Sequence, residues 1–238
     1  MTHSTTDAGT GLATSNRTPI GVAAVAGLAW FVAGFGASTP EGPEPGTATA
    51  EQVRTYVANN TDTLQLNAVS MLVGVAAIVT MVAALARIIE TARPGSVLPG
   101  AVRIGGAIAA VNLVLLLAID CVWLMLDESV GKLSDASVVT LYDVSAVSHA
   151  ASSVALPLEC VFVIGLVSFA AVQGRFLSRP VAGLGLLIGA AGAVSALEIV
   201  SSSAVFAAPF FFALFGWFLW PAISGVELGI RWLKARRS

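Results

Sequence analysis

The chain has 238 residues, of which 56% are hydrophobic and only 11% are charged, against roughly 25% charged residues in ordinary soluble domains. This composition predicts an all-α integral membrane protein and argues against a soluble domain. The net charge is −2 and the basic residues form no stripe, which argues against a nucleic-acid partner.

Six apolar runs are each about long enough to cross a bilayer, since a span takes about 20 mostly apolar residues. They predict a polytopic six-transmembrane-helix bundle made of three helical hairpins, within a membrane domain over 19–232. Residues 1–18 are rich in Thr, Ser and Gly and predict a disordered cytoplasmic tail, and 233–238 form a short basic tail. A signal peptide is the less favoured reading of the first run, because only Arg17 precedes it as a basic residue. The runs cover 20–35, 64–89, 101–126, 144–172, 181–202 and 209–230.

The basic residues divide unequally between the two sides that six spans would create. Ten of the twelve Lys and Arg residues fall on the side of the two termini, and only Arg54 and Lys132 fall on the other. The positive-inside bias therefore predicts a cell-membrane protein with both termini in the cytoplasm. Eight acidic residues fall in the two longer outer loops and make the outer face negative.

The outer connections differ in kind. Residues 38–50 are rich in Pro, Gly and Thr, which predicts an extended or disordered segment. The next residues resemble a short amphipathic helix with a capping box from Thr49 to Gln52, expected on the membrane surface or on the bundle. Ser134 can cap a helix that runs into the fourth span. The short connection 204–208 makes the last two spans antiparallel neighbours, with Pro209 in a first helical turn.

The fourth span carries a proline about midway. Pro157 has no N–H and clashes with the preceding turn, so a bend is expected there. The hydroxyls of Ser152 and Ser153, or water, can satisfy the freed backbone carbonyl. A bend flanked by hydroxyl groups and by Glu159 is a suitable lining for a polar pocket.

Ionisable side chains inside spans are costly and usually face a bundle interior. Counted from the outer ends, Asp120, His149 and Glu198 fall at one level, and Glu159 lies roughly 15 Å deeper than His149 at about 1.5 Å per residue. The bland alternative is a neutral buried carboxyl that only joins helices. The candidate binding residues are Asp120, His149, Ser152, Ser153, Glu159 and Glu198.

Several activities are excluded by counting. The only histidines are His3 and His149, too few for a bis-histidine haem or a three-histidine zinc site within the spans. A retinal protein needs a lysine in a span, and neither lysine lies in one. The catalytic motifs H-E-x-x-H, P-loop and G-x-S-x-G are missing from the sequence. No cofactor is expected, and an enzyme is disfavoured. A metal site made by Asp120, His149 and Glu198 stays open as a minor alternative.

The run GRFLSRPVAGLGLLIGAAG over 174–192, together with His149 in the preceding span, resembles a family of six-span bacterial membrane proteins known as a domain of unknown function. In that family a histidine motif tends to open the fourth span, and a basic loop leads into a glycine-rich fifth span. The resemblance implies the six-span layout and no established reaction.

Two classes of function stay open. The first is the binding or translocation of a small polar or cationic solute, with proton coupling as an option, through an outer-half cavity. The second is a membrane scaffold or accessory subunit that works through helix contacts, and a membrane-embedded enzyme is a distant third. The expected partners are the lipid bilayer and a small solute or proton, and a homo-oligomer stays open.

Overall fold

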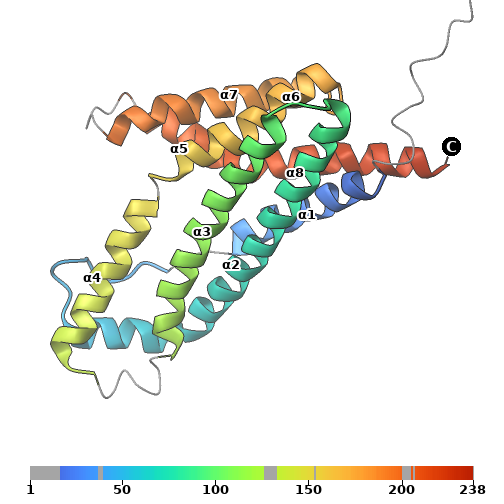
Figure 1. Ribbon diagram of the computed structural model, residues 1–238. Helices are drawn as coiled ribbons and strands as arrows, with labels where there is room; N and C mark the ends of the chain where they lie inside the picture. Colours follow the sequence, from blue (N-terminus) through green and yellow to red (C-terminus); the bar gives the residue numbers. More distant parts are fainter. Residues whose placement is uncertain are drawn as a thin grey trace, which may run out of the picture.

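The computed structural model describes residues 17–36, 40–125, 133–152, 154–199, 205 and 207–237. All regular elements in these residues are helical (Figure 1). They are α1 (Arg17–Gly36), α2 (Ala50–Ala92), α3 (Leu98–Met125), α4 (Asp135–Ser152), α5 (Leu156–Glu159), the π-helix η2 (Cys160–Gly165), α6 (Leu166–Gly174), α7 (Arg179–Ser195), the 3-10 helix η3 (Ala196–Ile199) and α8 (Ala207–Arg237).

By length and composition, five helical segments of the described chain can cross a membrane, namely α1, α2, α3, the stretch from α4 to α6, and α8. This indicates a multi-pass membrane protein, as the composition predicted. The fifth expected span is represented by α7, an apolar helix of only 17 residues. The count of six full-length spans in three hairpins is therefore not established by helix length.

Helix α2 is longer than the sequence predicted. The capping box is present, because Thr49 Oγ1 accepts the Gln52 N–H while Gln52 Oε1 accepts the Thr49 N–H. The helix then continues without a break, and α2 has 43 residues in all. The prediction of a separate short amphipathic helix is therefore wrong, because these residues form the first turns of α2. At about 1.5 Å per residue, α2 is roughly 65 Å long, about twice the ~30 Å hydrocarbon core.

The segment before α2 is held in place, which corrects the expectation of possible disorder for residues 40–49. The hydroxyls of Tyr56 and Tyr142 donate to the carbonyls of Pro40 and Pro43. The Gly46 N–H donates to Asp143 Oδ1 at 2.8 Å. The segment is thus fastened to the first turns of both α2 and α4.

The fourth span breaks where the proline predicted. Helix α4 ends at Ser152, a turn follows, and Pro157 lies in the first turn of α5, where its missing N–H costs least. Six residues of π-helix then follow directly. Ser153 lies outside the described residues, so its expected hydroxyl contact is not observed.

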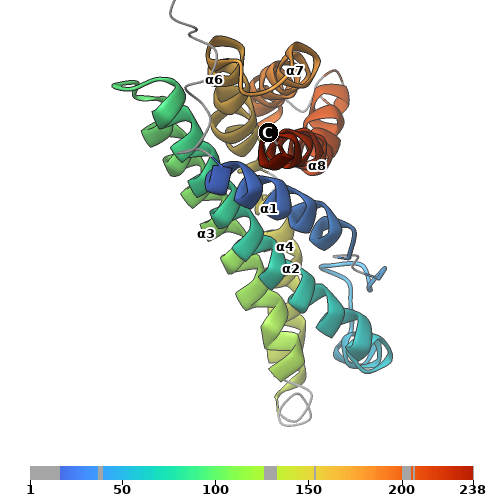
Figure 2. The same ribbon diagram turned by 90° about the vertical axis from the view of Figure 1, so that its right-hand side faces the viewer.

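The helices form two groups, which meet at α1 and also where α2 and α3 contact α5, η2 and α6. Helix α1 packs against both α2 and α8, α3 packs along α2, and α7 packs against η2, α6 and α8. Figures 1 and 2 show α2, α3 and α4 inclined across the group formed by α1 and α5–α8. Helix α8 continues through Arg237, so the basic residues expected in a tail belong to its last turns.

A second proline leaves a backbone carbonyl of α8 free to bond with α1. Pro221 lies inside α8 and has no N–H to donate to the carbonyl of Trp217, four residues earlier. The indole N–H of Trp30 donates to this carbonyl at 3.0 Å instead. The bond fixes Trp30 against α8 beside the cavity described below.

Candidate functional site

The site has two parts, which we name after the depths expected from the sequence. The first, the outer cluster, consists of polar side chains between α2, α3 and α4. Asn67 Nδ2 donates to Asp120 Oδ2 at 3.2 Å, and His149 Nε2 lies 3.4 Å from Asp120 Oδ1. His149 Nδ1 lies 2.9 Å from the carbonyl oxygen of Ser145. Both ring nitrogens therefore face oxygen acceptors, an arrangement that a doubly protonated ring satisfies.

The cluster confirms that Asp120 and His149 share a level. Asp120 itself is only 7% exposed. The Asp120 side chain can be buried because an amide and an imidazole from two neighbouring helices contact its oxygens. These contacts offset the cost of removing the side chain from water.

The inner part of the site is centred on Glu159. This residue is 4% exposed and accepts a hydrogen bond from Asn112 Nδ2 at 3.1 Å. It lies at the end of α5, between the proline break and the π-helix. Asn112 precedes Asp120 by eight residues on α3, so the two parts of the site are separated by about 12 Å along that helix.

Glu159 lines a partly open cavity of about 330 Å³ between α1, α2, α3, α4, α5 and α8. Its walls are mainly apolar, and four aromatic residues contribute: Trp30, Phe210, Trp217 and Phe218. The ring of Trp30 stacks on Phe218 with centroids 5.7 Å apart and meets Trp217 edge-on at 5.5 Å.

The polar groups of the cavity are few. They are the Glu159 carboxyl, the Asn112 amide and the hydroxyls of Ser70 and Ser152. Ser152 Oγ donates to the backbone carbonyl of His149 at 2.7 Å, so it joins the inner cavity to the helix turn that carries the outer cluster. One carboxyl and one amide in an aromatic cavity favour a ligand with a positive polar group on an apolar body.

The π-helix packs closely against α7, and this packing helps to fix the position of Glu159. A Cβ on Gly189 would lie 2.8 Å from the Cα of Gly165, and a Cβ on Gly192 would lie 2.7 Å from the Cβ of Cys160. Gly185, one turn before Gly189, is equally close to its neighbours, since a Cβ there would overlap the Ser168 hydroxyl. Backbone contact at these glycines fixes the turn that follows Glu159 directly.

Comparisons of the chain with protein-family models, curated proteins and solved structures found no match. The resemblance to a six-span family thus rests on the sequence motifs alone.

The predicted site residues divide into two pairs and two unobserved members. Asp120 contacts His149, while Ser152 and Glu159 line the inner cavity. The side chains of Ser153 and Glu198 lie outside the described part of the chain. Among the described residues, no group of three His, Cys, Asp or Glu side chains is arranged to hold a metal ion.

Sequence reasoning missed Asn67 and Asn112, which supply the amide donors of the two parts. Each is the only asparagine in its predicted span, and an amide in an apolar run usually bonds across helices. The asparagines in these two apolar runs were therefore a usable signal for the site.

Two further described acids, Glu227 and Glu90, have structural partners outside this site. Glu227 accepts hydrogen bonds from the Ser178 N–H and hydroxyl at 2.6 and 2.8 Å and pairs with Arg231. It therefore holds the start of α7 against α8. Glu90 pairs with Arg87 and Arg103, which joins α2 to α3.

Proposed function

We propose that the protein binds a small amphipathic cation, such as an ammonium group on an aromatic or aliphatic body, in the cavity headed by Glu159. The observation that carries this proposal is a 4% exposed carboxyl lining an aromatic cavity. A carboxylate in such surroundings attracts a cation strongly, because little water screens it.

The size and lining of the cavity support a ligand of this class. Its volume of about 330 Å³ lies at the small end of the usual range of about 300–1,000 Å³ for small-molecule sites. An ammonium group can donate to Glu159, and the faces of Trp217 and Phe218 can cover the apolar body. The carbonyl of Asn112 can accept a further hydrogen bond, since its amide nitrogen already donates to Glu159.

The polar residues further out support translocation as a finer version of the proposal. Ser70 lies one turn inward from Asn67 on α2, and Ser152 lies one turn inward from His149 on α4. Both serines line the cavity, whereas Asn67 and His149 surround Asp120. A cation or a proton entering at Asp120 and His149 would thus meet polar groups on its way to Glu159.

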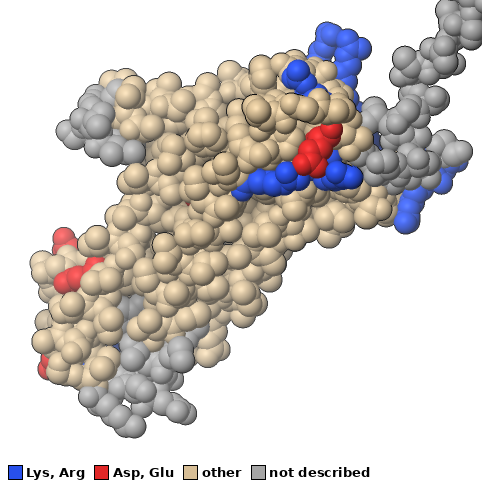
Figure 3. Space-filling view, in the orientation of Figure 1, with Lys and Arg blue, Asp and Glu red and all other residues tan. Residues whose placement is uncertain are grey.

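The charge distribution supports the proposed membrane placement. In Figure 3, basic side chains gather toward the end where α1 begins and α8 ends, and acidic ones lie mostly at the opposite end. We propose a cell-membrane protein with both termini in the cytoplasm, in which α7 is a sixth, shorter span. The motif resemblance over 174–192 supports the same count.

A scaffold that acts only through helix contacts is the alternative, and it requires no ligand. Isothermal titration of the purified protein in detergent with phenethylammonium, and separately with neutral 2-phenylethanol, distinguishes the two. Titration of detergent alone corrects for partitioning. We expect the amine to bind more tightly than the alcohol.

Replacement of Glu159 by Gln then tests the role of the carboxyl. A hydrogen bond to a charged group contributes about 1.5–3 kcal/mol, so Glu159→Gln should weaken amine binding roughly 10- to 100-fold and change alcohol binding little. Glu90→Gln is the matched control and should change neither. Equal amine affinities in wild type and Glu159→Gln, or no amine binding at all, would contradict the proposal and favour the scaffold.

A further inference from the structure

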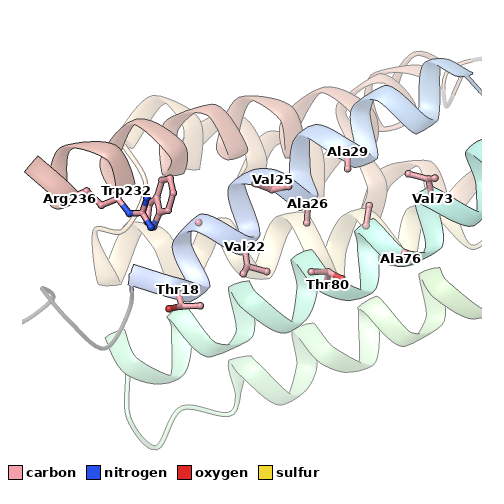
Figure 4. Close-up of a pocket in the computed structure, with 12 residues that line it drawn as sticks. Thr18, Val22, Val25, Ala26, Ala29, Val73, Ala76, Thr80, Trp232 and Arg236 are labelled. Atoms are coloured by element: carbon pink, nitrogen blue, oxygen red, sulfur yellow. The ribbon is translucent and has the colours of Figure 1, made fainter.

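A second cavity lies away from Glu159, as a groove of about 810 Å³ between α1 and α2 (Figure 4). Its walls are built from small and branched apolar side chains, among them Val22, Val25 and Ala29 on α1 and Val73 on α2. Val25 is 70% exposed. None of its lining residues is shared with the cavity of Glu159.

One end of the groove is charged and aromatic. The guanidinium of Arg236 lies 4.1 Å from the ring centroid of Trp232, and both side chains line the groove together with Thr18. The indole packs directly against α1, so closely that a Cβ on Gly21 would lie 3.0 Å from it. The last turns of α8 therefore close this end of the groove.

Arg236 differs in its pairing from Arg231 and Arg103, each of which lies against a carboxylate. Arg231 pairs with Glu227, and Arg103 pairs with Glu90, but none of the ion pairs found among the described residues includes Arg236. Its neighbours in the last turn of α8 are Lys234 and Arg237. Within the described part of the chain, the end of the groove thus presents positive charge with no carboxylate in an ion pair with Arg236.

The groove has the length of one membrane leaflet. From Thr18 to Ala29, α1 rises roughly 16 Å at about 1.5 Å per residue, about half of the ~30 Å hydrocarbon core. A tryptophan and an arginine at the end of an apolar helix are typical of the membrane–water interface. An apolar channel one leaflet long that ends in positive charge matches an acyl chain below a phosphate.

We propose that this groove is a binding site for an anionic phospholipid. One acyl chain lies between α1 and α2, and the phosphodiester is held by Arg236, with Trp232 and Thr18 as further hydrogen-bond donors. Arginine suits this role because its guanidinium donates to phosphate oxygens in a fork. Basic pockets between helices at this depth are typical of anionic headgroup sites.

The test measures lipid binding to the full-length protein by native mass spectrometry in detergent, with phosphatidylglycerol and phosphatidylcholine of identical acyl chains. We expect phosphatidylglycerol to bind at least fivefold more tightly. Arg236→Gln should remove this preference, and the matched control Arg237→Gln, with the same loss of charge one residue along, should keep it. Equal binding of the two lipids by wild type, or equal effects of the two variants, would overturn the proposal.

A second pair of variants tests the acyl chain. Val25→Trp should fill the groove and weaken phosphatidylglycerol binding several-fold without removing the headgroup preference. Leu187→Trp introduces the same side chain at an exposed position of α7 outside the groove and should have no effect. If Val25→Trp and Leu187→Trp bind phosphatidylglycerol equally well while their helicity by circular dichroism is unchanged, the groove is not the site.

Discussion

At the scale of single residues, the fully buried side-chain nitrogen and oxygen atoms of the described residues are hydrogen-bonded with one exception. Among the described side chains, Ser168 Oγ is the one fully buried nitrogen or oxygen atom that has no hydrogen-bond partner. It lies against Gly185, where a Cβ would overlap the hydroxyl. This serine therefore contributes a desolvation cost without a compensating bond.

Replacing Ser168 by Ala should stabilise the fold. An unsatisfied buried hydroxyl costs about 1–3 kcal/mol, so Ser168→Ala should raise the free energy of unfolding by about 1 kcal/mol, measured by denaturant titration in detergent. Ser224 is the matched control, since its buried hydroxyl donates to the Pro221 carbonyl at 3.1 Å. Ser224→Ala should leave stability unchanged or lower it; a loss of stability in Ser168→Ala would contradict the account.

At the scale of elements, α7 and the π-helix are held together by backbone contact at glycine. A Cβ at Gly189 would meet the Cα of Gly165, which cannot rotate away as a side chain can. Overpacking of this kind costs typically 1–3 kcal/mol. Because η2 directly follows Glu159, separating α7 from η2 should also disturb the cavity.

Gly189→Ala should therefore lower both thermal stability and amine affinity. The control is Gly183→Ala on the same helix, where an added Cβ meets nothing within 4 Å. Alanine has the higher helix propensity by about 1 kcal/mol, so Gly183→Ala should be neutral or stabilising. Melting followed by circular dichroism, with the amine titration repeated on each variant, makes the comparison. Similar melting temperatures for the two variants would show that the Gly165–Gly189 contact is unimportant.

The sequence predicted the elements better than their ends. The Thr49–Gln52 capping box and the break at Pro157 were predicted correctly, because both depend on residues close in sequence. The continuity of α2 was missed, because hydropathy detects where a helix crosses apolar surroundings and not how far it continues into water. The fixed segment 40–49 depends on Tyr142, about a hundred residues away, and local patterns do not report such contacts.

The sequence predicted several of the residues that make the site, but not how they are arranged in space. Ionisable residues in apolar runs identified Asp120, His149 and Glu159, and all three are partnered by polar groups from other helices or turns. Their division into an outer cluster and an inner cavity follows from helix crossings that no local pattern encodes. The role of Trp30 depends on the carbonyl that Pro221 leaves free on another helix.

At the scale of the whole molecule, two cavities flank α1 and α2 and differ in chemistry. The inner one is lined in part by aromatic rings and contains a carboxyl, whereas the groove is lined by small apolar side chains and ends at an arginine. The first suits a cation and the second an anion. The opposite charges make the two proposals independent, because a ligand of either site is repelled by the charge of the other.

The most direct test is an experimental structure of the protein with bound 4-bromophenethylammonium, in which anomalous scattering locates the bromine. The account predicts the ammonium nitrogen within about 2.7–3.2 Å of a Glu159 carboxylate oxygen and the brominated ring against Trp217 and Phe218. A structure in which Glu159 faces lipid, or in which the amine occupies another place and leaves this cavity without it, would contradict the account.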